Sequence, residues 1–122
     1  MYNIEIKVTE KIFIITMRGN LTDQESLDFL AEYAEKVNTI VSTEYTCVID
    51  IFGLKATSPY LVAKLIKGQE LMMKNPFKII YSIMPESGIV SSQIEKVGKD
   101  EYVLDNTIIV NNYRDILKLV NL

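Results

Sequence analysis

The chain has 122 residues, of which 48% are hydrophobic and 24% are charged. This length and composition predict one soluble globular domain, residues 1–122, with enough apolar side chains for a core of its own. The net charge of -3, without a local Lys/Arg cluster, argues against nucleic acid as a partner. No apolar run reaches the roughly 18 residues of a membrane span. The first residues do not resemble a signal peptide, so we expect a cytoplasmic protein that does not enter a membrane.

The residue types that most catalytic and metal sites need are missing from the sequence. There is no histidine, and Cys47 is the single cysteine. A disulfide, a Cys/His zinc site and a histidine general base are therefore excluded, and there is no glycine-rich phosphate loop. We predict a protein without catalytic residues, metal or cofactor. Cys47 lies among strand-forming residues, which favours a small buried side chain over a reactive thiol.

The first third of the chain predicts a hairpin followed by a helix. Apolar and polar residues alternate at 3–10, and a more apolar stretch follows at 11–19, as in two paired strands. Thr22 is a good N-cap residue, and Glu25 stands three positions later, which is the spacing of a capping box. Charged residues of this helix occupy one side, at Asp28, Glu32, Glu35 and Lys36. The apolar residues at helical spacing predict a buried stripe made of Leu27, Leu30, Ala34, Val37 and Val41.

The rest of the chain alternates strands and helices. The nearly continuous apolar run at 46–52 is typical of a strand covered on both faces, and we expect it at the centre of the sheet. A helix should begin at 58–59 and end before Pro76. Strands follow at 77–84 and 107–110, with helices within 85–99 and at 112–122. The order β-β-α-β-α-β-α-β-α predicts an α/β fold. We expect a mostly parallel sheet of four to five strands with packed helices, and the opening strand antiparallel at an edge.

Four sequence clusters in this order carry a family resemblance. They are MRGNLT at 17–22, CVIDIFGL at 47–54, TSPYLVAKL at 57–65 and TIIVNNYRDILKLV at 107–120. They resemble the STAS domain of anti-sigma factor antagonists in its glycine-containing turn, its strand ending in aspartate, its phosphorylatable turn, and its final strand and helix. The resemblance covers essentially the whole chain. It implies a bacterial, non-enzymatic phosphoprotein of partner switching, which binds a protein such as an anti-sigma factor kinase.

The phosphorylatable turn departs from the family pattern, which is usually Asp-Ser-Ser/Thr-Gly. One residue is missing before it, Thr57 replaces the aspartate, Pro59 replaces the second hydroxyl and Tyr60 replaces the glycine. The resemblance makes Ser58 the first phosphorylation candidate and Thr57 the second. The residues alone make Ser58 the N-cap of the second helix. Both roles are compatible, because the positive end of a helix favours a phosphate.

Two functional hypotheses remain open from the sequence. The first is an interaction module. The second is a small-ligand sensor or a subunit of an oligomeric scaffold, with the same fold and no phosphorylation; self-association into a homo-oligomer is open in either. Asp50 has two possible roles: a functional carboxylate at the end of the strand, or a carboxylate that bonds the backbone of the Gly53 turn. Gly19 is interpreted as a backbone-geometry residue before the helix. The predicted partner-binding residues are Gly19, Asn20, Asp50, Gly53, Thr57, Ser58 and Tyr60.

Overall fold

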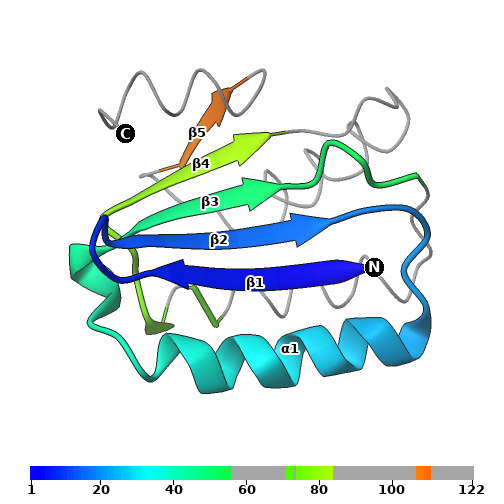
Figure 1. Ribbon diagram of the computed structural model, residues 1–122, viewed down its shortest axis with the longest axis horizontal. Helices are drawn as coiled ribbons and strands as arrows, with labels where there is room; N and C mark the ends of the chain where they lie inside the picture. Colours follow the sequence, from blue (N-terminus) through cyan, green and yellow to red (C-terminus); the bar gives the residue numbers. More distant parts are fainter. Residues whose placement is uncertain (56–70, 73, 84–106, 111–122) are drawn as a thin grey trace.

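The computed structural model describes residues 1–55, 71, 72, 74–83 and 107–110, which form a five-stranded sheet, the helix α1 and the end of a further helix (Figure 1). The strand order is β1-β2-β3-β4-β5. Only β1 is antiparallel to its neighbour, and the remaining pairs are parallel. The elements are β1 (Tyr2–Lys7), β2 (Ile12–Met17), α1 (Asp23–Val37), the short 3-10 helix η1 (Ser42–Glu44), β3 (Thr46–Asp50), β4 (Ile79–Ile83) and β5 (Thr107–Val110).

This arrangement confirms the predicted α/β class and mostly parallel sheet. The opening strand is antiparallel at an edge, and β3 is central among the described strands. Leu71, Met72 and Lys74 are helical, and the helix they belong to ends before Pro76 as expected. The start of that helix and the helices predicted within 85–99 and at 112–122 lie outside the described residues. The assignment of residues 1–122 to one domain stays a prediction.

The start of α1 has the predicted capping box. The Thr22 side-chain oxygen accepts the Glu25 backbone N–H at 3.1 Å, and Glu25 Oε1 accepts the Thr22 backbone N–H at 3.1 Å. Two N–H groups that a helix start leaves without a partner are thereby satisfied. Local sequence is enough to define this boundary.

The predicted buried stripe of α1 was partly wrong. Leu27 and Val41 are exposed, at 43% and 60%, and α1 ends at Val37, before Val41. With about 100° of rotation per residue, Leu27 lies roughly a third of a turn from the centre of the stripe that contains the aromatic residues. Large aromatic side chains determine the orientation of α1 because they bury the most area. The buried residues of α1 are Ser26, Phe29, Tyr33 and Val37.

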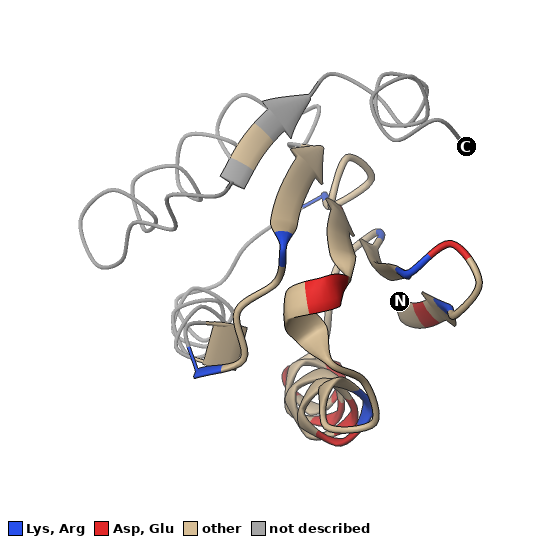
Figure 2. Ribbon diagram, turned by 90° about the vertical axis from the view of Figure 1, so that its left-hand side faces the viewer, with Lys and Arg blue, Asp and Glu red and all other residues tan. Residues whose placement is uncertain are grey.

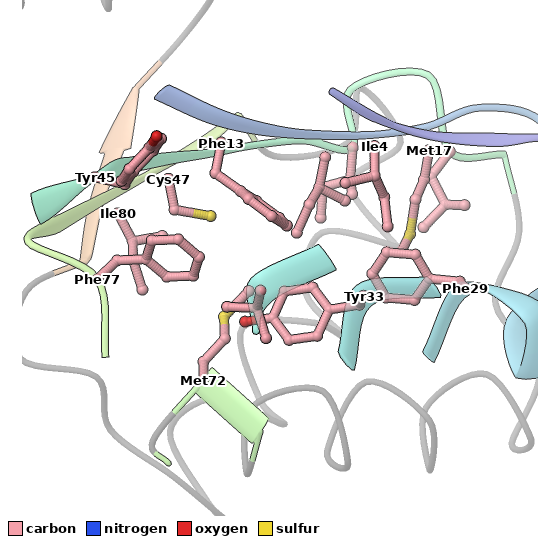
Figure 3. Packing of buried hydrophobic residues seen from close by; sticks show 14 residues of the cluster. Ile4, Phe13, Met17, Phe29, Tyr33, Tyr45, Cys47, Met72, Phe77 and Ile80 are labelled. Atoms are coloured by element: carbon pink, nitrogen blue, oxygen red, sulfur yellow. The ribbon is translucent and has the colours of Figure 1, made fainter. Parts of the chain in front are cut away.

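The core lies between α1 and the sheet. Phe13 packs edge-on against Tyr33 with ring centroids 5.7 Å apart, and it lies 5.3 Å from the ring of Phe77. Figure 3 shows these rings with Cys47 on the sheet side of the cluster. Cys47 is completely buried, which confirms its predicted placement, and burial raises the pKa of its thiol.

The other face of the sheet is buried as well. Val48 follows Cys47 in β3, points to the opposite face and is also completely buried. It packs in a second cluster with side chains of β2 and β4, namely Ile12, Tyr81 and Ile83. Burial on both faces explains why the sequence of β3 is continuously apolar rather than alternating.

Candidate functional site

The segments that follow β2 and β3 lie side by side at the carboxyl ends of these parallel strands (Figure 1). Thr16 pairs with Asp50 at the end of the shared ladder. Beyond it, the Gly19 N–H donates to the Gly53 carbonyl at 2.8 Å, and the Lys55 N–H donates to the Gly19 carbonyl at 3.0 Å. We call residues 18–20 and 50–55 the strand-end surface. Its backbone is held by hydrogen bonds between two segments that are distant in sequence.

Gly19 has the backbone role predicted for it. Its φ of 68° lies in the left-handed region, which residues other than glycine rarely adopt without strain. This conformation lets residue 19 bond both to Gly53 and to Lys55. The interpretation of Gly19 as a backbone-geometry residue is confirmed.

Asp50 holds the turn that follows β3. Its Oδ1 accepts the backbone N–H of Phe52 at 3.2 Å, which confirms the hypothesis that this carboxylate bonds the turn containing Gly53. Its Oδ2 lies 4.0 Å from Nη2 of Arg18. The Asp50 side chain is 20% exposed and that of Arg18 is 58% exposed, so the ion pair itself adds little stability. The hydrogen bond to Phe52 is the main structural role of Asp50.

Arg18 and Phe52 are site residues that the sequence analysis did not identify. Arg18 is far from Asp50 in sequence, and only the parallel register of β2 and β3 brings the two together. The sequence feature that could have pointed to Arg18 is its position directly before Gly19, a predicted site residue. Phe52 is 45% exposed although it belongs to a hydrogen-bonded turn. Aromatic residues, Phe among them, are enriched in protein interfaces.

The predicted site residues divide into two groups. The structure brings Gly19, Asn20, Asp50 and Gly53 together on the strand-end surface, where Asn20 is exposed. Their role in partner binding stays a prediction. The other predicted residues, Thr57, Ser58 and Tyr60, lie outside the described residues.

The opposite end of the sheet offers a contrast. There the β1–β2 hairpin carries charges of both signs (Figure 2). Lys11 pairs with Glu44 at 3.2 Å between Nζ and Oε2, and both side chains are more than half exposed. Such exposed pairs contribute little binding or stability. The strand-end surface, with its ordered backbone and exposed ring, is therefore the better candidate site.

Comparisons with known proteins place the fold. No protein-family model matches the sequence, and no curated protein matches it. Among solved structures, the anti-sigma factor antagonist SpoIIAA in its unphosphorylated form matches with a TM-score of 0.65 and 14% identity, covering 100% of this chain and 98% of that one. The chain has a SpoIIAA-like fold. The fold expected from the STAS resemblance is thus confirmed.

A second solved structure agrees with the first. An uncharacterised protein with a SpoIIAA-like fold from Shewanella loihica matches with a TM-score of 0.66 and 16% identity, covering 98% of this chain and 92% of that one. At such identities the likeness concerns the fold, and function has to be argued from the site. In the described part of the chain, no helix has the length and apolar character that crossing a membrane requires.

Proposed function

We propose that this protein is a non-enzymatic regulatory module that binds another protein in the manner of an anti-sigma factor antagonist. The observation that carries the proposal is the structural match to SpoIIAA over 100% of this chain and 98% of that one. The proposed partner is an anti-sigma factor of the kinase type, in the bacterial cytoplasm. The strand-end surface is the proposed docking site, together with Thr57, Ser58 and Tyr60.

The chemistry of the strand-end surface supports a binding role. Phe52 and Arg18 belong to residue classes that contribute strongly to protein interfaces, because aromatic rings and guanidinium groups combine apolar contact with directional bonds. Both are exposed and lie beside the Asp50 carboxylate. The backbone bonds at Gly19 and Gly53 hold the surface in place, so less ordering entropy is lost on binding.

The same surface is a poor basis for catalysis. Asp50 is its only carboxylate, and this group accepts the Phe52 N–H and lies next to Arg18. A general acid or base works best when its pKa lies near the working pH and when a second group shares the proton transfer. Residues 18–20 and 50–55 supply neither histidine nor a second carboxylate.

Phosphorylation at Ser58, with Thr57 as second candidate, is the proposed switch. Ser58 follows Lys55 of the strand-end surface by three positions, so the chain keeps the Cα atom of Ser58 within about 11 Å of the Cα atom of Lys55. A phosphate adds about two negative charges and three acceptor oxygens. In a docked interface such a charge lowers the affinity for the partner, unless an opposite charge of the partner compensates it.

The docking surface is tested with matched alanine variants. Phe52→Ala and Arg18→Ala should each weaken binding to the candidate anti-sigma factor about tenfold or more, in titrations with the purified partner. Val41→Ala is the control, because Val41 is also exposed but does not belong to the strand-end surface. Undiminished affinity of both surface variants would exclude this docking site.

The switch is tested with Ser58→Asp and Ser58→Ala. Ser58→Ala should lower the free energy of unfolding by ~1 kcal/mol if Ser58 is an N-cap, while retaining the partner. Ser58→Asp should fold as well as the parent and lose the partner. Binding by Ser58→Asp at parental affinity, with Ser58 and Thr57 unmodified in native cells, would contradict the switch. Stabilisation by a metabolite instead would favour the ligand-sensor alternative.

A further inference from the structure

The outer edge of β1 offers backbone groups that β2 does not use. Among the described strands, β1 pairs only with β2. Met1 and Arg18 exchange two backbone hydrogen bonds, of 2.8 and 3.0 Å. Since bonded and non-bonded pairs alternate in an antiparallel ladder, the N–H and C=O groups of Tyr2, Ile4 and Ile6 point away from β2, to the outer edge. Such an edge is a template for another strand.

Lys36 of α1 occupies the middle of this edge. Its Nζ donates to the Ile4 carbonyl oxygen at 3.0 Å. Glu32, one turn earlier on α1, holds the same ammonium at 3.1 Å through Oε2. The other carboxylate oxygen of Glu32 accepts the Tyr2 hydroxyl at 3.2 Å. Lys36 and Glu32 of α1 are therefore both hydrogen-bonded to β1. Figure 1 shows that α1 runs alongside this strand.

The sequence of β1 suits pairing with a second copy of itself. An antiparallel pair centred on Ile4 would place Ile4 opposite Ile4, Tyr2 opposite Ile6 and Asn3 opposite Glu5. Each pair then lies on one face of a continuous sheet. A pair centred on Glu5 would instead set two like charges directly opposite each other, which is unfavourable. The register centred on Ile4 avoids this contact between like charges and places the outward-pointing groups of Ile4 opposite each other.

In that register, the Ile4 carbonyl would accept the Ile4 N–H of the second copy. This is the oxygen to which the Lys36 ammonium is bonded. We propose that Lys36 closes the edge of β1, and that removing its positive charge allows two copies to associate through antiparallel β1 strands. The proposal depends on α1 and β1 alone and does not rest on the proposed function.

The first test measures self-association after removal of the ammonium. Lys36→Met and Lys36→Gln both remove the charge and keep a helix-compatible side chain. Each should raise the association constant of the dimer about tenfold or more over the parent, in analytical ultracentrifugation. Lys74→Met is the control, since Lys74 is helical and exposed and its replacement changes the net charge equally. Circular dichroism verifies that the variants fold.

Either of two results would overturn the proposal at this stage. The first is unchanged association of both folded Lys36 variants. The second is equal association of Lys74→Met, which would attribute the effect to net charge. If Lys36→Met fails to fold, Lys36→Gln alone decides.

The second test determines the register. Asn3 and Glu5 are exposed, so each can be replaced by cysteine without disturbing the core. In the background of Lys36→Met, a mixture of Asn3→Cys and Glu5→Cys proteins should form a disulfide between the two variants, detected by mass. Each variant alone should form far less. Predominant linkage of Glu5→Cys with itself, or the same cross-link with Lys36 intact, would show that Lys36 does not control this edge.

Discussion

The Asp50 carboxylate accepts the backbone N–H of Phe52 at 3.2 Å. The residue that ends the central strand thereby fixes the backbone position of an exposed aromatic ring. This bond connects the end of β3, where Asp50 lies, to the turn after it, which carries Phe52. Changes at Asp50 should consequently affect both stability and binding.

We expect Asp50→Ala to lower the free energy of unfolding by about 1 kcal/mol, because the Phe52 N–H loses its acceptor. Asp50→Asn keeps an acceptor oxygen and should cost less. Partner affinity should fall more for Asp50→Ala than for Asp50→Asn, since the turn that carries Phe52 becomes less ordered. Urea unfolding and affinity titration measure the two effects. Parental stability of Asp50→Ala would show that the bond is not important.

The two glycines of the strand-end surface should respond differently to alanine. A Cβ at Gly19 meets no atom within 4 Å, so the cost of Gly19→Ala comes from the left-handed backbone alone, about 1–2 kcal/mol. Gly19→Asn should cost less, because asparagine tolerates this conformation better. At Gly53, a Cβ would lie 3.2 Å from Cγ of Arg18.

Gly53→Ala should therefore move the flexible Arg18 side chain and reduce partner affinity more than stability. Thermal unfolding of the Gly19 and Gly53 variants, combined with affinity titration, separates the two effects. Equal stability of Gly19→Ala and Gly19→Asn would contradict the backbone explanation.

Tyr33 should tolerate the loss of its hydroxyl group. Within the described part of the chain this buried hydroxyl has no hydrogen-bond partner, and burial is the main reason that its pKa is raised. Tyr33→Phe should leave the free energy of unfolding unchanged or raise it by up to about 1 kcal/mol, because an unsatisfied buried group is removed. Tyr2→Phe is the matched control and should lower it by roughly 0.5–1 kcal/mol, since Tyr2 donates to Glu32. A clear destabilisation by Tyr33→Phe would reveal a partner for its hydroxyl.

Cys47 should react with thiol reagents only when the protein opens. Its thiol is completely buried, and burial raises its pKa, because the thiolate is poorly solvated in the core. The folded state therefore retains the thiol proton to higher pH than the unfolded state does. This contribution to stability is present below the unfolded pKa of about 8.5 and is lost as the pH rises above it.

Two measurements test this behaviour of Cys47. Labelling at neutral pH should be slow and should accelerate on addition of urea. Unfolding followed between pH 7 and 10 should show a stability decline that is smaller in Cys47→Ala. Rapid labelling of the folded protein would contradict burial.

Much of the fold could be predicted from the sequence, because its signals are local. The alternation in β1, the continuous apolar run of β3 and the capping box of Thr22 and Glu25 each involve neighbouring residues. The mostly parallel pairing followed from the alternation of strands and helices. The orientation of α1 could not be predicted in this way. The exposed Leu27 and the buried Phe29 both fit a helical period, and only packing against the sheet decides which of them is buried.

The sequence by itself determined the described strands, the start of α1, the fold class and the turn functions of Gly19 and Asp50, since the signals for these come from residues close together in the sequence. The tertiary structure decided which distant residues meet. The parallel register of β2 and β3 places Arg18 beside Asp50, and the packing of α1 brings Lys36 to the Ile4 carbonyl. Such contacts depend on register and helix rotation, which are set by the burial of large side chains over the whole sheet rather than by local preference.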